Sequence, residues 1–156
     1  ANRKILLQMK KILVLCTGNS CRSQMAEGWI RYFLKDKVVV YSAGTHPEPV
    51  NPYSILVMRE AGVDISNHTS NHVDEYKDFH FDFVFTVCDN AKEICPVYSN
   101  ANKLIHHSFP DPAKAIGTKE EIIETYSNVR EKIKEYFLNF ELLLKSKNIS
   151  VIVRPN

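Results

Sequence analysis

The sequence has no strong excess of charge and no long apolar stretch. Its 20 Lys and Arg residues are almost balanced by 18 Asp and Glu residues, which gives a formal net charge of +2. Nucleic-acid binders and polybasic membrane binders depend on clustered positive charge, so this balance argues against both classes. No apolar run approaches the roughly 18 residues that a membrane-spanning helix needs. Hydrophobic residues nevertheless make up 44% of the chain, which excludes a disordered protein.

Cysteine is also scarce. The four cysteines are too few for a disulfide scaffold, but they are more than a core of this size requires. We identify no secretory signal, and therefore expect a cytoplasmic protein whose reduced thiols are available for chemistry. The 156 residues suffice for one domain. We place this domain at residues 9–147, between an extension or expression remnant over residues 1–8 and a tail over residues 148–156.

Strand and helix patterns alternate along the chain. A continuous apolar run over residues 11–16 is typical of a central parallel strand that is buried on both faces. Asn51 and Pro52 predict a helix start, and Thr118 with Glu121 forms a capping box before a long amphipathic helix. Further strands are expected over residues 37–42, 81–87 and 103–107, and further helices over residues 25–34 and 89–95. The alternation predicts a single α/β domain, a four-stranded parallel sheet flanked by helices on both faces.

The loop after the first strand carries the clearest functional signal. Cys16 and Arg22 bracket five residues in a C-x5-R pattern, at the carboxyl edge of the sheet where open α/β proteins bind ligands. Such a loop surrounds a tetrahedral oxyanion with backbone N–H groups, the next helix adds its positive end, and Arg22 donates two parallel hydrogen bonds. The same groups are expected to lower the pKa of Cys16, so that its thiolate is a nucleophile, and the Ser23 hydroxyl is placed to stabilise that thiolate.

A chance C-x5-R pattern would leave a buried Cys at a strand end and an exposed Arg at a helix start. The apolar strand before the loop, the flexible Gly-Asn pair within it and the helix behind it favour the oxyanion site instead. The residues of this predicted oxyanion-binding loop are Thr17, Gly18, Asn19, Ser20, Cys21, Arg22 and Ser23.

The stretch CTGNSCRSQMAEG over residues 16–28 resembles the signature of the thioredoxin-coupled arsenate reductases. These enzymes are relatives of the low-molecular-weight protein tyrosine phosphatases and share their fold. The resemblance continues through VYSAG (40–44), DISNHTS (64–70) and DPA (111–113), and spans about residues 10–145. It implies the low-molecular-weight phosphatase-like fold, and it implies that Asp111 is the general acid that protonates the leaving oxygen. Without the resemblance, an Asp between two prolines would be interpreted as a turn residue.

Two departures from the phosphatase pattern favour a small inorganic oxyanion over a phosphoprotein. Phosphatases of this superfamily typically place aromatic residues just after the Asp-Pro pair, where they flank a phosphotyrosine ring. This chain has Ala113, Lys114 and Ala115 there, and none of these side chains stacks on an aromatic substrate. It also has Gln24 where phosphatases usually have proline.

Cys88 and Cys95 are the other two chemically interesting residues. A spacing of seven places them on one face of the helix expected there, but about 10.5 Å apart along its axis. A disulfide needs Cα atoms within about 7 Å, so the two residues pair only if that helix unwinds or loops out. Taken alone, they would be interpreted as two small buried apolar residues. Six residues separate the two cysteines, whereas cysteine ligands of structural zinc sites are typically separated by two to four, so a zinc site is disfavoured.

The resemblance implies that these cysteines form a relay. Cys16 attacks arsenate, Cys88 attacks the sulfur of Cys16, and Cys95 attacks Cys88 to leave a Cys88–Cys95 disulfide that thioredoxin reduces. Arsenic must gain two electrons, so two thiols must be oxidised. A phosphatase has no such requirement. The expected catalytic residues are therefore Cys16, Arg22, Asp111, Cys88 and Cys95, with no bound cofactor and with thioredoxin and an arsenate or phosphate-like oxyanion as partners.

Two features of the loop stay open. Cys21 suits either a protective disulfide with Cys16 or simple packing, and packing is favoured. Some members of the family bind potassium beside the loop, at positions that correspond here to Asn19, Glu27, Ser42 and Asn71. Asn71 stands where an Asp is usual, which removes one anionic ligand and weakens the case for potassium.

Two alternative functions follow from the same residues. The first is a low-molecular-weight protein tyrosine phosphatase, which would hydrolyse phosphomonoesters through a Cys16 phosphocysteine with only Cys16, Arg22 and Asp111. The second is a non-catalytic redox or oxyanion-sensing module, against which the complete Cys-Arg-Asp set argues.

Overall fold

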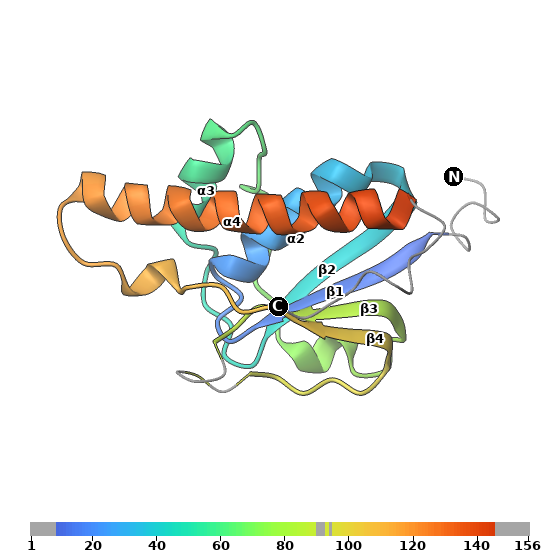
Figure 1. The fold of residues 1–156 in the computed structure, drawn as a ribbon. Helices are drawn as coiled ribbons and strands as arrows, with labels where there is room; N and C mark the ends of the chain where they lie inside the picture. The colour runs from blue at the N-terminus through green and yellow to red at the C-terminus, as the bar shows by residue number, and fades with distance from the viewer. Residues whose placement is uncertain (1–8, 90–92, 94, 146–156) are drawn as a thin grey trace.

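Four parallel strands form the centre of the computed structural model, which describes residues 9–89, 93 and 95–145 (Figure 1). The strands lie side by side in the order β2-β1-β3-β4. Their bounds are β1 Lys10–Cys16, β2 Val38–Gly44, β3 Phe81–Thr86 and β4 Ala101–His106. The prediction of a single α/β domain with a four-stranded parallel sheet is confirmed.

β1 occupies a central place because its side chains are apolar on both faces. Residues 12–16 are all buried, as expected for a strand with neighbours on both sides. In the register of the sheet, Cys16 pairs with Gly44 of β2, and Leu15 pairs with Thr86 of β3. The carboxyl ends of three strands therefore meet at the point where the chain leaves β1, which is where ligands bind in open parallel sheets.

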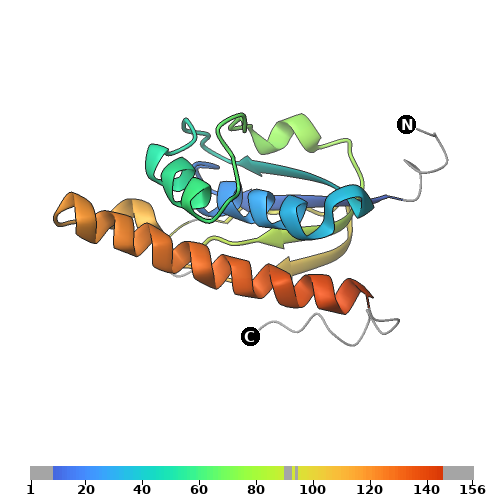
Figure 2. The same ribbon diagram turned by 90° about the horizontal axis from the view of Figure 1, so that it is seen from above.

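Three α-helices cover one face of the sheet (Figures 1 and 2). They are α2 Arg22–Leu34, α3 Pro52–Glu60 and α4 Lys119–Lys145. α4 buries the apolar stripe that its sequence predicts: Tyr126, Val129, Ile133, Phe137 and Phe140. This stripe packs against Phe83 and Phe85 of the sheet and against α2, which fixes the helix that begins at Arg22. No helix in the described part of the chain is long and apolar enough to cross a membrane.

The other face is covered by η2, a 3-10 turn over Val73–Tyr76 (Figure 1). Tyr76, Phe79 and Tyr98 pack with Phe81 and Tyr41 on this side. Helical elements thus lie on both faces, as predicted. The layers are unequal, however, since the second face is closed by one short turn and a cluster of aromatic rings.

The predicted helix starts are confirmed by their hydrogen bonds. The Asn51 side chain accepts a bond from the Tyr53 N–H, and Thr118 and Glu121 exchange both bonds of a capping box. The helix expected over residues 89–95 is not seen at the residues that the structure describes there. Residues 90–92 and 94 lie outside the described residues, while Asp89, Glu93 and Cys95 are not helical.

Candidate active site

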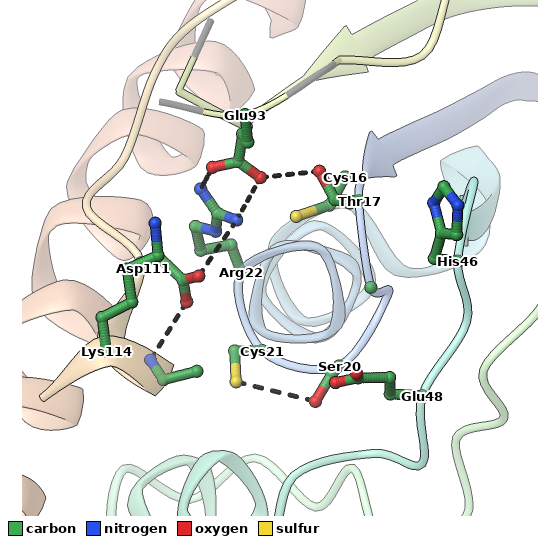
Figure 3. Close-up of a pocket in the computed structure, with 12 residues that line it drawn as sticks. Cys16, Thr17, Ser20, Cys21, Arg22, His46, Glu48, Glu93, Asp111 and Lys114 are labelled. Carbon is green, nitrogen blue, oxygen red and sulfur yellow. Dashed lines mark hydrogen bonds and ion pairs between the residues drawn. The ribbon is translucent and has the colours of Figure 1, made fainter. Parts of the chain in front are cut away.

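The predicted oxyanion loop forms the floor of a pocket of about 260 Å³ (Figure 3). β1 delivers Cys16 to this pocket, and the first turn of α2 delivers Arg22. The pocket is lined by Cys16, Thr17, Gly18, Ser20, Cys21, Arg22, His46, Glu48, Glu93, Asp111, Ala113 and Lys114. The sequence-predicted nucleophile, anion ligand and acid therefore share one cavity.

The backbone carbonyls of the loop point away from this pocket. They accept hydrogen bonds from the neighbouring segment over residues 46–51 and from a side chain of α2. These bonds run from His46 N to Thr17 O, Glu48 N to Gly18 O, Asn51 N to Ser20 O and Gln24 Nε2 to Asn19 O, at 2.9 to 3.1 Å. In a trans peptide the next N–H points opposite to the carbonyl, so these bonds turn the loop N–H groups toward the pocket. That is the geometry of an anion-binding nest.

Asn19 holds the loop in this shape. It is fully buried and has a positive φ of 48°, a conformation that Asn tolerates better than most residues. Its Nδ2 donates to Ser23 at 2.8 Å and to Ser42 at 2.9 Å, while its Oδ1 accepts from the Asn71 N–H at 2.8 Å. Both ends of the amide are satisfied, which ties the loop to β2 and to the segment before η2.

Arg22 is buried and points into the pocket, but its guanidinium group is already paired with the carboxylate of Glu93. Its Nη1 donates to Glu93 Oε2 at 2.7 Å, and its Nη2 donates to Glu93 Oε1 at 2.8 Å (Figure 3). Nη1 also reaches the Phe109 carbonyl at 3.3 Å, and Nη2 lies 3.7 Å from Asp111 Oδ2. Nε is buried with no partner among the described residues. Such an orphaned donor is expected in a site that is built for an anion.

Asp111 lines the pocket beside Arg22. It precedes η3, a short 3-10 turn over Pro112–Lys114, and its Oδ1 accepts the Ala113 N–H at 3.0 Å. Its other oxygen approaches Arg22. The side chain is 23% exposed, so it is accessible to water. Asp111 thus lines the same pocket as Cys16 and Arg22, and its role as general acid stays a prediction.

Cys88 and Cys95 form a disulfide, and their Cα atoms are 5.8 Å apart. Cys88 is fully buried and lies just beyond β3, next to the end of β1, because the Val87 N–H donates to the Leu15 carbonyl at 3.0 Å. Cys95 is half-buried. Cys16 and Cys21 are free thiols. Cys16, Cys88 and Cys95 consequently share one region of the core.

Comparison with known proteins assigns this fold and site to a family. The profile described as low molecular weight phosphotyrosine protein phosphatase matches residues 11–149. The chain belongs to this family. Among its relatives, the arsenate reductases of Halalkalibacterium halodurans and Bacillus subtilis are each 45% identical over 127 residues, which cover 81% of this chain and 91% of those proteins. A solved structure of an arsenate reductase in oxidized state is similar with a TM-score of 0.73 and 29% identity, covering 86% of this chain and 98% of that one.

For a family named after phosphotyrosine, the pocket is poorly equipped to hold an aromatic ring. Its described lining residues include no Phe, Tyr or Trp. Ala113 and Lys114 occupy the wall beside Asp111, where the sequence already predicted that a stacking partner would be missing. A small oxyanion needs no such partner.

Burial outweighs the expected lowering of the Cys16 pKa by the loop, so the prediction of a lowered net pKa is wrong for the structure with the Cys88–Cys95 disulfide. Burial raises the pKa of the Cys16 thiol, and this effect exceeds the lowering by Arg22 and the Thr17 N–H. The carboxylates of Glu93 and Asp111 raise the pKa further. The sequence suggested a positive loop, but folding brings two carboxylates to it and leaves Arg22 paired.

Cys21 is a buried residue of the loop that also packs against the core. It is 4% exposed, and its sulfur lies 3.7 Å from both the Tyr126 hydroxyl and the Ser20 hydroxyl. Burial raises the pKa of the Cys21 thiol. These contacts suit the packing role that the sequence favoured.

The four potassium candidates come together behind the loop. Glu27 accepts from Ser42 at 2.6 Å, Ser42 accepts from Asn19, and Asn71 donates its N–H to Asn19. The other oxygen of Glu27 accepts a bond from Arg31 at 2.8 Å, so a guanidinium already balances its charge. The described residues contain no group of three or more His, Cys, Asp or Glu side chains placed to hold a metal ion. Potassium binding stays a prediction.

Sequence reasoning missed Glu93, the residue in closest contact with Arg22. It also missed His46 and Glu48 on the rim of the pocket. Their only signal is indirect. Glu93 lies between the two relay cysteines, and His46 and Glu48 follow the Gly44 turn after β2, so both segments start at the same edge of the sheet as the loop.

Proposed function

We propose that this protein reduces arsenate to arsenite and ends each cycle with the Cys88–Cys95 disulfide. The single observation that carries the proposal is that disulfide, which lies next to the end of β1, where the free Cys16 begins the loop. Hydrolysis of a phosphoester would leave such a redox pair without a role. The relatives that are named arsenate reductases, at 45% identity, support the same conclusion.

The first step forms a bond between sulfur and arsenic. The Cys16 thiolate attacks As(V), and one arsenate oxygen leaves as water after it is protonated by Asp111. Arg22 and the loop N–H groups hold the remaining oxygens, which carry the negative charge of the transition state. Water leaves and no electrons have yet been transferred.

The second step transfers the electrons. The Cys88 thiolate attacks the Cys16 sulfur, the sulfur–arsenic bond breaks, and arsenic departs with the electron pair as As(III) arsenite. Cys95 then attacks Cys88 and releases Cys16 as a thiolate. Two thiols have become one disulfide, which balances the two electrons gained by arsenic.

The third step resets the enzyme. We propose thioredoxin as the dithiol that reduces Cys88–Cys95, as the resemblance to the thioredoxin-coupled enzymes implies. Cys95 is half-buried and Cys88 is fully buried, so Cys95 is the more accessible of the two. This chemistry suits a cytoplasmic location, where a dithiol reductant is available. The mechanism needs no bound cofactor.

Phosphatase activity is the second candidate, because Cys16, Arg22 and Asp111 are arranged for phosphoryl transfer as well. One assay separates the two functions. Arsenate, thioredoxin, thioredoxin reductase and NADPH are supplied, and NADPH oxidation is followed in wild type, Cys88→Ser and Cys95→Ser, while aryl-phosphate hydrolysis reports whether the loop is intact. We expect arsenate-dependent oxidation in wild type and none in either variant, with hydrolysis retained in all three. Absence of arsenate-dependent oxidation in wild type, or normal turnover in both variants, would refute the proposal.

A further inference from the structure

Glu93 reaches from the disulfide segment into the oxyanion site. Its two oxygens accept from the two terminal nitrogens of Arg22 at 2.7 and 2.8 Å, and Oε1 also accepts from the Thr17 hydroxyl at 2.6 Å. The Glu93 carboxylate thus presents two oxygens to the two terminal nitrogens of Arg22, in the same way as a bound oxyanion would. Figure 3 shows the carboxylate lying between the arginine and the start of the loop.

The terminal N–H groups of Arg22 have little capacity left for a substrate. Nη1 donates to Glu93 and to the Phe109 carbonyl, and Nη2 donates to Glu93 and faces Asp111. Only the buried Nε lacks a partner among the described residues. An oxyanion that is to be held by the arginine fork must therefore displace Glu93.

The surroundings of Glu93 favour its ionised form. Its side chain is 13% exposed, and burial opposes ionisation. The hydrogen bonds from Arg22, Thr17 and the Asp89 N–H outweigh that effect and lower the pKa of Glu93 to about 2. At neutral pH the site thus contains a resident anion.

The disulfide holds Glu93 near the loop. Glu93 lies two residues before Cys95, its N–H donates to the Asp89 carbonyl at 2.9 Å, and its Oε2 accepts the Asp89 N–H at 3.0 Å. Cys88 is fully buried and anchors the other end. The cysteine Cα atoms are 5.8 Å apart, whereas a helix would separate them by about 10.5 Å. Cleaving the disulfide removes the cross-link that restricts this segment.

We propose that Glu93 is an internal competitor of the oxyanion, active when the Cys88–Cys95 disulfide is formed and released when it is reduced. Because Glu93 is part of the same chain as Arg22, it competes with a free oxyanion as if it were present at an effective concentration of about millimolar. The oxidised protein therefore binds free oxyanions weakly, and reduction by a dithiol, which supplies two electrons and two protons, restores binding.

This inference deepens the proposed function and rests on it. In the proposed cycle, the disulfide forms as arsenite departs, so Glu93 takes over Arg22 when the product leaves. Phosphate and a second arsenate are then excluded from an enzyme that has no thiols to reduce them. The apparent Kd is the intrinsic Kd divided by the fraction of molecules with a free arginine, so 10% free arginine raises the apparent Kd about tenfold.

The test is the Kd of inorganic phosphate, measured by titration calorimetry on oxidised and dithiothreitol-reduced protein. Thiol counting defines the two forms, because the disulfide form has Cys16 and Cys21 as its free cysteines. We expect oxidised wild type to bind phosphate at least about tenfold more weakly than the reduced form. In Glu93→Gln, and in Glu93→Ala as a second variant, the Kd of phosphate should differ by no more than about twofold between the oxidised and the reduced protein. Glu48→Gln removes another carboxylate of the same pocket and should keep the wild-type difference.

Equal affinities of the two wild-type forms would overturn the inference, and that comparison needs no variant to fold. A difference that persists in both Glu93 variants, or that Glu48→Gln also abolishes, would overturn it as well. Phosphate binding requires no arsenate turnover. Failure of the NADPH assay therefore counts against the proposed function, and failure of the phosphate comparison counts against the role of Glu93.

Discussion

Cys88 and Cys95 are seven residues apart in sequence, yet their Cα atoms lie only 5.8 Å from one another. A helix through both residues would hold them about 10.5 Å apart. The disulfide and a continuous helix through both cysteines are therefore mutually exclusive. Cys88 lies at the edge of the sheet where Cys16 ends β1, so the disulfide and the substrate site are neighbours.

The relay predicts different products in the two cysteine variants. Reduced Cys95→Ser is expected to release one arsenite per protein in a single turnover and to stop as a Cys16–Cys88 disulfide. Cys88→Ser should release none, because nothing attacks the Cys16 sulfur. Peptide mass spectrometry identifies the disulfide. Equal arsenite release by both variants would contradict the order of the relay.

The position of Asp111 predicts a leaving-group effect. Asp111→Asn should lower kcat for aryl-phosphate hydrolysis by about 10²- to 10⁴-fold, because a general acid is lost, while KM changes little. The loss should be greatest for phenyl esters with poor leaving groups and smallest for nitrophenyl esters. A uniform loss for all esters would indicate that Asp111 positions Arg22 and does not donate a proton.

The network around Asn19 predicts a stability cost. Asn19→Ala leaves the Ser23 and Ser42 hydroxyls and the Asn71 N–H without this partner. We expect the free energy of unfolding in urea to fall by about 1–3 kcal/mol, as for other unsatisfied buried polar groups. Asn139→Ala on the exposed face of α4 is the matched control and should change it by less than about 0.5 kcal/mol. Equal effects would show that the loop does not depend on the amide.

The ion pair between Arg31 and Glu27 predicts that wild type is insensitive to potassium. Replacing NaCl with KCl at constant ionic strength should leave kcat/KM for arsenate reduction unchanged, because the Glu27 carboxylate is already paired with the Arg31 guanidinium at 2.8 Å. Arg31→Ala removes that partner and should make activity depend on potassium. Stimulation of wild type by KCl would instead support the potassium site that the resemblance implies.

The charges at the loop predict the pH dependence of Cys16 alkylation. A raised pKa means less thiolate at neutral pH, so Cys16 of the oxidised protein should react slowly with iodoacetamide until the pH exceeds the usual thiol range. Glu93 raises this pKa, so Glu93→Gln should shift the alkylation profile to lower pH. Peptide analysis separates Cys16 from Cys21. An unchanged profile would contradict the electrostatic coupling between Glu93 and Cys16.

Local pattern was sufficient to predict much of this fold. The apolar run of β1, the Asn51 cap and the Thr118–Glu121 capping box each depend on neighbours in sequence, and each is found as predicted. The apolar stripe of α4 is equally local. The cover of the second face by η2 was not predictable, because the aromatic residues at positions 76, 79 and 81 follow neither a helical nor a strand period.

The site was predictable only in part. Cys16 and Arg22 lie in one loop, and Asp111 was found through a resemblance. Glu93 contacts Arg22 across 71 residues of sequence, and no local rule connects them. The raised pKa of Cys16 has the same origin, since it arises from burial and from carboxylates that reach the loop only in the folded chain.

The arsenate reductase mechanism is tested most directly by a single turnover without any added reductant. Fully reduced protein is mixed with excess arsenate, and arsenite and free thiols are counted. We expect one arsenite to be released for every two thiols lost, with Cys88–Cys95 as the product disulfide. Thiols that stay intact with no arsenite formed, or an equal loss of thiols when phosphate replaces arsenate, would contradict it.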